Sequence, residues 1–518
     1  MKKVNKKRRK SLKLSHGKPF SLVRSPGVLG LEIFNNLTHY KDFSKPFFTA
    51  SRYFNSVEYW RSINSNPFER FISLSQLFGM NTDLLRRGLF STFQNVGDYF
   101  RKDMTDMIHG LINTFQFNNS KDVETFQALI YRKFKTFELL TQALPQAVLD
   151  SEKEFGFHFE RCNNKKIAET VRFKLYRITP TDKGVKTDPT KKPVLIIPPY
   201  VLGANILAFL PNQNKSYVHS FANKGIPTYI RIQKDIIDNE PVQLMTPEDD
   251  TNDTVVFCEK IKKIHGKQVT LNGYCQGGFF AVCNILSGKL DGLVDTLITN
   301  VAPMDGTKNK GLKGFLNNLP TVYNNLSYGT KTLPNGNKIA DGEIMSWIYK
   351  LNSIENETPI VSLLKKVAMF DFKGNKDCSV NLTYAALNYW LSHEKTDLPL
   401  EITRFSYDSF SKSVEQNGEL PVRLFGEHLN FKRISEKNIK WMICYGENDD
   451  LVEKSSALAP LDHIPVETTS FPKGHVAIAT SWSDPDSKYA LDKRFGKRKG
   501  RGPVLFHMER DEELYKKQ

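Results

Sequence analysis

The chain has 518 residues, of which 40% are hydrophobic, 12% aromatic and 25% charged. This is the composition of an ordinary globular protein of two or three domains. It excludes a chain that is disordered throughout, a collagen-like chain and a small disulfide-stabilised scaffold. The six cysteines are scattered and form no C-x-x-C pair, so we expect neither a structural zinc site nor a disulfide framework, and we expect a cytoplasmic location.

The net charge of +17 is concentrated in two short clusters. Residues 1–13 contain eight Lys or Arg and residues 493–501 contain six, with no acidic residue in either, which leaves +3 for the rest of the chain. We interpret both clusters as solvated segments, with contact to an anionic surface or to a polyphosphorylated substrate as the alternatives. No nucleic-acid-binding motif is present, so nucleic acid is not an expected partner. The most apolar stretch, 194–210, is interrupted by two prolines and an asparagine, and no transmembrane segment is predicted.

Hydrophobic periodicity changes along the chain. Apolar residues at three-to-four spacing predict helices over 84–111 and 126–144. From about residue 170, short apolar runs separated by turns predict strands that alternate with helices, which indicates a mostly parallel sheet covered on both faces. The predicted strands are 171–178, 193–197, 228–232, 268–272, 293–300, 440–445 and 466–471, and helices are predicted at 216–223 and 251–264.

The alternation stops between about 306 and 435, where a helix-rich, aromatic stretch is interpreted as an insertion. The predicted organisation is a basic flexible tail (1–27), a helical N-terminal region (28–165), the first part of an α/β core (166–305), a cap or lid insertion (306–438), and the second part of the core with a basic C-terminal segment (439–518).

The strongest chemical motif is GYCQGG at 273–278. It lies between a predicted strand and an apolar segment, which is the strand–turn–helix context of a nucleophile elbow. Such an elbow holds its nucleophile, here Cys275, in a strained conformation, and the chain turns so tightly that glycine is required beside it. The elbow glycines are Gly273, Gly277 and Gly278. The amino terminus of the following helix favours the thiolate form of the cysteine.

Two further strand ends complete a candidate catalytic triad. The strand at 440–445 runs into the sequence GENDD, which contains Asp449 and Asp450, and the strand at 466–471 is followed by PKGH, which ends at His475. Nucleophile, acid and histidine follow in the chain order of the α/β-hydrolases. We therefore predict a catalytic triad of Cys275, an acid of the GENDD loop and His475. No metal site is predicted, because the other histidines lack ligand spacing.

Residues 193–482 resemble the poly(3-hydroxyalkanoate) synthase family, which are acyltransferases of the α/β-hydrolase fold with a catalytic cysteine. The segments that carry the resemblance are PVLIIPPYV (193–201), GYCQGG (273–278), LITNVAPMD (297–305), LNYW (387–390), YDSFSKSVEQNGEL (407–420), GENDDLV (446–452) and GHVAIATSW (474–482). The resemblance implies that Cys275 is acylated, with Asp449 and His475 as acid and base. It also implies that the backbone N–H groups of Gln276 and Tyr200 form an oxyanion hole.

The resemblance further implies that the chain polymerises (R)-3-hydroxyacyl-CoA into polyhydroxyalkanoate and releases coenzyme A. No separate cofactor is expected, because coenzyme A is part of the substrate. A homodimer formed through the cap and association with the surface of polyester granules are implied as well. The chain departs from the family at Asp450, where histidine is usual, and at Leu391 and Glu453. Two alternatives stay open: a cysteine hydrolase of thioesters or esters, and a granule-associated binding protein.

Overall fold

The computed structural model describes residues 65–115, 124–159, 164–311, 329–346, 380–496 and 500–515, with single positions between 52 and 63 and between 365 and 369. The predicted basic tail at 1–27, parts of the predicted cap and residues 497–499 lie outside the described residues. Contacts divide the chain into two compact units. One contains Asn81–Asp150 together with Met1–Val57 and Ser353–Ala385, and the other contains Glu58–Met80, Ser151–Asn352 and Ala386–Gln518.

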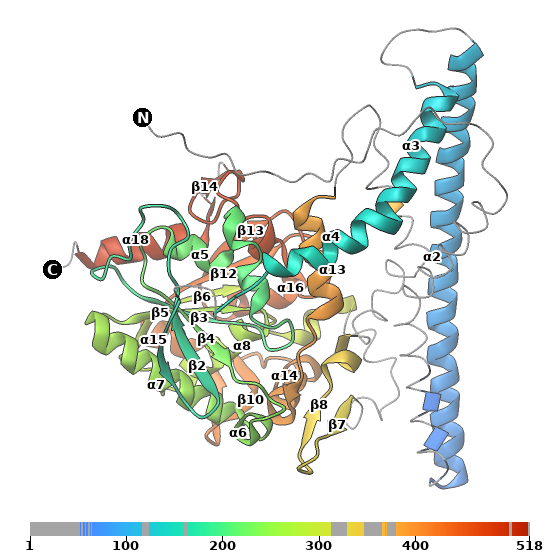
Figure 1. Cartoon of the computed structure of the whole chain (residues 1–518). Helices are drawn as coiled ribbons and strands as arrows, with labels where there is room; N and C mark the ends of the chain where they lie inside the picture. Colours follow the sequence, from blue (N-terminus) through green and yellow to red (C-terminus); the bar gives the residue numbers. More distant parts are fainter. Residues whose placement is uncertain are drawn as a thin grey trace, which may run out of the picture. The chain divides into compact units, whose positions relative to one another are not determined.

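The N-terminal region is helical where it is described. The long helix α2 spans Pro67–Phe115, and α3 spans Phe126–Glu138 (Figure 1). The side chain of Thr125 accepts a hydrogen bond from the Ala128 N–H and so caps the first turn of α3. A π-helical turn (Leu139–Ala143) joins α3 to α4 (Leu144–Asp150), whose second residue is a proline that cannot donate a helical hydrogen bond. Helices predicted at 84–111 and 126–144 are thus present. Helix α2 extends beyond its predicted limits, whereas the second prediction is divided into α3, the π-helical turn and the start of α4.

The second unit is built around an eight-stranded sheet with the order β1-β2-β4-β3-β5-β6-β12-β13. Its strands are β1 (Lys165–Glu169), β2 (Phe173–Arg177), β3 (Val194–Ile197), β4 (Thr228–Gln233), β5 (Val269–Tyr274), β6 (Val294–Asn300), β12 (Lys440–Gly446) and β13 (Glu467–Phe471). Neighbours from β4 to β13 are parallel, whereas β2 pairs antiparallel with both β1 and β4. This order, with its antiparallel second strand, is that of the α/β-hydrolase fold, so the predicted fold class is confirmed.

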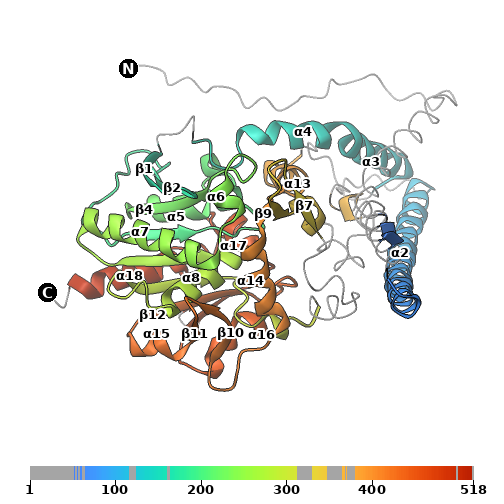
Figure 2. The same cartoon turned by 90° about the horizontal axis from the view of Figure 1, so that it is seen from below.

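Helices cover both faces of this sheet. Helices α5 (Tyr217–Ala222) and α18 (Pro503–Tyr515) lie on one face, and α7 (Pro247–His265), α8 (Gln276–Leu286) and α15 (Lys432–Glu436) lie on the other (Figures 1 and 2). Because both faces are covered, every residue of β3 and of β5 is buried. Helix α7 begins earlier than predicted, because Thr246 and Asp249 form a capping box ahead of its first apolar residues.

The described part of the predicted insertion contains strands as well as helices. Strands β7 (Thr330–Thr332), β8 (Lys338–Ala340) and β9 (Leu398–Pro399) form a small antiparallel sheet, and β10 (Glu419–Leu424) pairs with β11 (Glu427–Asn430) as a hairpin. Strands β7, β8 and β9 have only two or three residues, which is too short to show an alternating pattern. The six-residue β10 does alternate between buried and less buried positions, and the helix-rich prediction for this stretch is wrong there. The helices of this part are α13 (Leu382–His393) and α14 (Leu400–Ser411).

Helix α14 lies against the first turn of α8. The ring of Phe405 on α14 contacts the rings of Phe279 and Phe280 on α8, with centroids 5.9 Å and 5.3 Å apart. Shorter elements complete the unit: α6 (Glu240–Gln243), α16 (Lys454–Ala457), α17 (Ala477–Thr480), β14 (Arg494–Phe495) and β15 (Gly500–Arg501). The insertion is therefore packed directly over the elbow that follows β5.

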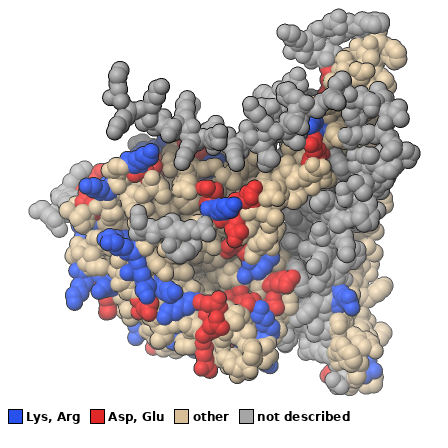
Figure 3. Space-filling view, in the orientation of Figure 1, with Lys and Arg blue, Asp and Glu red and all other residues tan. Residues whose placement is uncertain are grey.

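Two surface properties bear on possible partners. Figure 3 shows Lys and Arg side chains interspersed with Asp and Glu on the face that it displays, in keeping with the small net charge outside the two basic clusters. Within the described ranges, no helix has both the length and the apolar character that crossing a membrane requires.

Candidate active site

Cys275 occupies the sharp turn between β5 and α8. Its backbone has φ 51° and ψ −126°, a conformation that a residue with a side chain rarely adopts. The Cys275 N–H donates a hydrogen bond of 2.8 Å to the carbonyl of Asn300 at the end of β6, which anchors the turn to the neighbouring strand. The residue is buried, with 8% of its surface exposed. This is the strained nucleophile position that the motif predicts.

The elbow glycines lie where no side chain fits. A Cβ atom on Gly273 would be 2.4 Å from the Cα of Gly278, and one on Gly277 would be 2.4 Å from the carbonyl oxygen of Pro198. A Cβ on Gly278 would be 2.6 Å from the Cβ of Ala302. The first two clashes are with backbone atoms, which cannot rotate away. The requirement for glycine is therefore steric, and Gly277 brings α8 into contact with the loop that follows β3.

The acid and the histidine come together from two strand ends. Asp449 follows β12 and His475 follows β13, and the Nδ1 of His475 lies 2.9 Å from the Oδ2 of Asp449. The other carboxylate oxygen, Oδ1, accepts hydrogen bonds from the N–H groups of Leu451 (3.0 Å) and Val452 (2.9 Å), so the carboxylate is held in one orientation. Asp450 is exposed. The structure thus places Asp449, rather than its neighbour, against the imidazole.

The electrostatics of His475 link it to the cysteine. Burial lowers the pKa of His475, but the charge of Asp449 and the neighbouring Cys275 side chain raise it by more, so that its pKa lies well above the usual value. Its second ring nitrogen, Nε2, is buried and has no hydrogen-bond partner among the described residues. With Nδ1 turned to the carboxylate, Nε2 is the nitrogen available to take a proton from the thiol.

The two predicted oxyanion-hole residues flank the same turn. Tyr200 follows β3 and the Pro198–Pro199 pair, and Gln276 is the first residue of α8. Among the described residues, neither of their backbone N–H groups has a hydrogen-bond partner. The next N–H along the loop, that of Val201, is already used, since it donates to the side-chain oxygen of Gln276 at 3.2 Å. An oxyanion hole needs N–H donors that are not already used, so these two groups remain candidates for that role.

The buried ion pair between Arg231 and Asp250 holds the side chain of Tyr200. The Tyr200 hydroxyl donates to Asp250, which also pairs with Arg231, and all three side chains are buried. Asn284 donates to the second carboxylate oxygen of Asp250 at 2.8 Å, and Arg231 donates to the hydroxyl of Thr254 at 2.7 Å. Burial raises the pKa of Tyr200 well above its usual value, so the phenol keeps its proton and stays a donor. With its partners present, the buried charge pair is satisfied.

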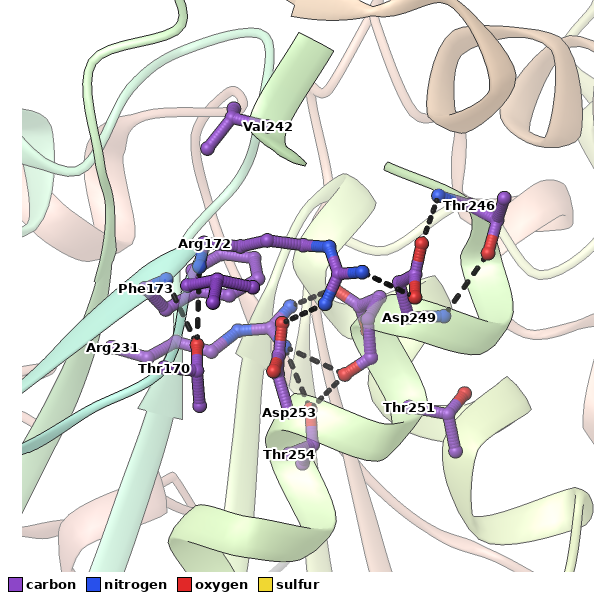
Figure 4. A network of polar contacts seen from close by, with 12 residues as sticks. Thr170, Arg172, Phe173, Arg231, Val242, Thr246, Asp249, Thr251, Asp253 and Thr254 are labelled. Atoms are coloured by element: carbon purple, nitrogen blue, oxygen red, sulfur yellow. Dashed lines mark hydrogen bonds and ion pairs between the residues drawn. The ribbon is translucent and has the colours of Figure 1, made fainter. Parts of the chain in front are cut away.

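The same network continues towards the start of α7. Figure 4 shows the guanidinium of Arg172 reaching both Asp249 and Asp253, at 2.5 Å and 3.3 Å, while Asp249 also forms the capping box with Thr246. Partial burial of Asp253 raises its pKa, although the charge of Arg172 acts in the opposite direction. Sequence reasoning did not find this network, because its members are far apart in the chain and follow no motif.

The insertion also holds the loop after β3. The indole N–H of Trp390 donates to the carbonyl of Leu202 at 3.2 Å, and the side-chain amide of Asn205 donates to the carboxylate of Glu394 at 3.0 Å. Burial raises the pKa of Glu394. Within the described residues, no group of three or more His, Cys, Asp or Glu side chains has the arrangement of a metal site.

Fold and geometry together define an α/β-hydrolase-fold protein with a cysteine at its nucleophile elbow. No protein-family model and no curated protein matches the chain. Solved structures do match it. Proline iminopeptidase of Mycobacterium smegmatis is 12% identical, covers 68% of this chain and 100% of its own, and has a TM-score of 0.35. The thioesterase domain from the curacin biosynthetic pathway is 10% identical, covers 62% of this chain and 96% of its own, and has a TM-score of 0.34. Est1E of Butyrivibrio proteoclasticus is also 10% identical, covers 68% of this chain and 100% of its own, and has a TM-score of 0.32.

Proposed function

We propose that this chain is a cysteine-dependent acyl-transfer enzyme. It takes an acyl group from a thioester onto Cys275 and passes that group to an acceptor oxygen. The observation that carries the proposal is the arrangement of His475: its Nδ1 is paired with Asp449, and its buried Nε2 has no partner among the described residues and is coupled electrostatically to the Cys275 sulfur. A thiol at a strained elbow beside an oriented imidazole is the arrangement of an activated nucleophile.

In the first half-reaction, His475 accepts the Cys275 proton at Nε2 and the thiolate attacks the thioester carbonyl. The oxygen of the tetrahedral intermediate gains a negative charge, which the N–H groups of Gln276 and Tyr200 stabilise. When the intermediate collapses, the carbon–sulfur bond to coenzyme A breaks and the imidazolium returns its proton to the leaving thiolate. One thioester replaces another, so this step is nearly balanced in free energy.

In the second half-reaction, His475 removes the proton of the acceptor hydroxyl, whose oxygen attacks the acyl-cysteine. The thioester bond to Cys275 breaks, and the sulfur takes the proton back from His475. An oxygen ester or an acid is formed from a thioester, and this step is downhill. Cysteine suits the sequence of steps better than serine, because serine would form the oxygen ester before the acceptor arrives. Asp449 stabilises the imidazolium in both halves.

The acceptor that we propose is the 3-hydroxyl group of a second acyl unit, which makes the reaction a polymerisation. This version comes from the sequence resemblance, and the enclosure of the site supports it. Cys275 is 8% exposed, and Phe405 of α14 packs against Phe279 and Phe280 over the first turn after it. Keeping water from the acyl-cysteine favours transfer to an alcohol over hydrolysis.

Hydrolysis is the second candidate, with water as the acceptor and a thioester or ester as the substrate. The feature that favours it is Asp450, which is exposed and stands where the synthase family carries histidine. Glu453 departs from that family in the same loop, and its N–H donates instead to the side chain of Asn309 at 2.7 Å. Both versions use the same acyl-cysteine, so they differ only in the second half-reaction.

Two measurements test the proposal. Brief exposure to 3-hydroxybutyryl-CoA followed by peptide mass spectrometry should find the acyl adduct on Cys275, and Cys275→Ala should release no coenzyme A while remaining folded. Undiminished coenzyme A release by Cys275→Ala would overturn the proposal. Product analysis then separates the acceptors, since polymerisation yields insoluble polyester and hydrolysis yields the free hydroxy acid.

A further inference from the structure

The side chain of Gln276 bridges two segments that are distant in the chain. Its Oε1 accepts the Val201 N–H at 3.2 Å, in the loop after β3, and its Nε2 donates to the hydroxyl of Ser406 on α14 at 2.6 Å. The residue is 7% exposed. The Gln276 amide therefore accepts a hydrogen bond from the loop after β3, here called the oxyanion loop, and donates one to the insertion. An apolar side chain of the same size could form neither hydrogen bond.

The loop that Gln276 holds carries one of the two oxyanion donors. Val201 directly follows Tyr200, whose N–H is free among the described residues. The Tyr200–Val201 pair is therefore fixed on two sides, through the Tyr200 phenol on Asp250 and through the Val201 N–H on Gln276. With both tethers in place, the Tyr200 N–H has little freedom to turn. Without the Gln276 tether, the Val201 N–H would lose its hydrogen bond, and the loop would be held by the Tyr200 side chain and by the Trp390–Leu202 hydrogen bond further along.

Ser406, the second partner of the Gln276 side chain, lies on a helix that is packed against α8. Ser406 follows Phe405, whose ring packs against Phe279 and Phe280 of α8, and Phe280 in turn contacts the ring of Tyr200 at a centroid distance of 5.3 Å. Helix α14, the elbow helix and the oxyanion loop therefore form one aromatic cluster with the Gln276 amide bonded across it. A displacement of α14 would be transmitted to Val201 through two hydrogen bonds.

We propose that the Gln276 side chain is a positioning residue for the oxyanion hole and that it couples α14 to that hole through Ser406. The inference rests on the proposed function and deepens it: the backbone N–H of Gln276 stabilises the oxyanion directly, and its side chain orients the second donor, Tyr200. Gln276 thus serves the same hole twice, once through its backbone and once through its side chain.

The test separates oxyanion stabilisation from nucleophile activation. Acylation of Cys275 by 3-hydroxybutyryl-CoA passes through a tetrahedral oxyanion, whereas alkylation of Cys275 by iodoacetamide does not. Gln276→Leu keeps the size and removes both hydrogen bonds, so the acylation rate should fall about 10- to 100-fold, since losing an oxyanion donor outright costs about 10²- to 10³-fold. The rate of alkylation should stay within about twofold, because the thiol and His475 are unchanged.

Two further variants provide controls. Gln276→Asn keeps the amide but is too short to span both partners, so it should behave like Gln276→Leu and stands in for that variant should it fail to fold. Ser406→Ala cuts only the arm to α14 and should lower acylation by a smaller factor, about two- to fivefold. In the double variant Gln276→Leu with Ser406→Ala, acylation should be no slower than in Gln276→Leu alone, because both changes break the same bridge.

Three results would overturn the inference. Acylation by Gln276→Leu or Gln276→Asn at the rate of the unaltered protein would show that the bridge is not needed. A parallel fall of acylation and alkylation would show that Gln276 supports the elbow and not the oxyanion hole. Absence of any acyl adduct on the unaltered protein would overturn the proposed function itself, and this inference with it. The unaltered protein is therefore measured first, and this result is distinguishable from the other two because those require an acylated unaltered protein.

Discussion

The hydroxyl of Tyr274 donates a hydrogen bond of 2.7 Å to the backbone carbonyl of His475. The two rings also meet edge to face, with centroids 6.3 Å apart. Tyr274 directly precedes Cys275 and is fully buried, and burial raises the pKa of its phenol well above the usual value, so that it remains a donor. One side chain next to Cys275 therefore sets the position of the loop that carries the histidine.

Replacing Tyr274 by Phe should loosen that loop without disturbing the elbow. We expect the free energy of unfolding to fall by about 1 kcal/mol, the usual net value of one hydrogen bond. We also expect kcat to fall with little change in KM, because the His475 Nε2 would no longer be held beside the thiol. Urea denaturation and steady-state coenzyme A release measure the two effects. Tyr445→Phe on β12 is the matched control and should leave kcat unchanged.

Asp449 and Asp450 are adjacent acids with different surroundings, and only the first contacts the imidazole. Asp449→Asn should lower turnover by roughly two to four orders of magnitude, because the amide leaves the imidazole in the wrong tautomer. Asp450→Asn should lower it by about tenfold or less, through the local field alone. Coenzyme A release at matched concentrations of folded protein decides between the two acids. A larger loss in Asp450→Asn would mean that the acid is the other residue.

The same variant should move the pH dependence of the reaction. The charge of Asp449 raises the pKa of His475, and the base must be deprotonated to act, so activity in the unaltered protein should be lost as the pH falls through a value above 6.5. Asp449→Asn removes that charge and should shift the acidic limb of the kcat/KM profile to lower pH. An acidic limb that stays in place would contradict the assigned pair.

Gly277 offers a steric test of the elbow. A single methyl group there would lie 2.4 Å from the carbonyl oxygen of Pro198 and 2.5 Å from that of Ile197, so either the loop after β3 or α8 must move. Gly277→Ala should destabilise the protein by about 1–3 kcal/mol, the usual cost of overpacking, and abolish acylation. Gly97→Ala, in the exposed interior of α2 where a Cβ meets no atom within 4 Å, is the control; it should leave acylation intact and should not destabilise the protein, because alanine favours a helix over glycine by up to about 1 kcal/mol. An active, stable Gly277→Ala protein would disprove the elbow.

A buried histidine of α18 should limit stability in acid. His507 lies between the hydroxyl of Thr270 and the carbonyl of Lys192, each 3.0 Å away, and burial lowers its pKa to about 4. Because the unfolded chain protonates near pH 6.5 and the folded chain only near 4, this residue's contribution is complete above 6.5 and is lost as the pH falls. The loss by pH 4 should be about 3 kcal/mol.

Chemical denaturation at pH 7 and at pH 4.5 measures that loss. His507→Gln can make both hydrogen bonds without titrating, so its unfolding free energy should fall less between the two pH values than that of the unaltered protein. An equal pH dependence in both proteins would show that His507 does not titrate as inferred.

Much of the fold and of the elbow could be predicted because the signals are local. Strands buried on both faces, such as β3 and β5, appear as short apolar runs, and the glycines of GYCQGG stand within three residues of the cysteine whose turn requires them. The order of Cys275, Asp449 and His475 along the chain follows from the order of strand ends. Edge strand β1 was missed, because its five residues are exposed or half-buried and carry no alternating apolar pattern.

The hydrogen bonds of the candidate site were decided only by the tertiary structure. The local pattern alone does not separate the two adjacent acids of the GENDD loop, although the family resemblance implies Asp449. In the structure Asp449 contacts His475 while Asp450 remains exposed. The bridge from Gln276 to Val201 and Ser406 spans 75 and 130 residues of chain, and no local pattern records it. Hydrophobic periodicity reports the face on which a side chain is buried. A hydrogen bond depends on distances and angles between two groups, and these are set only when strands distant in the chain are packed side by side.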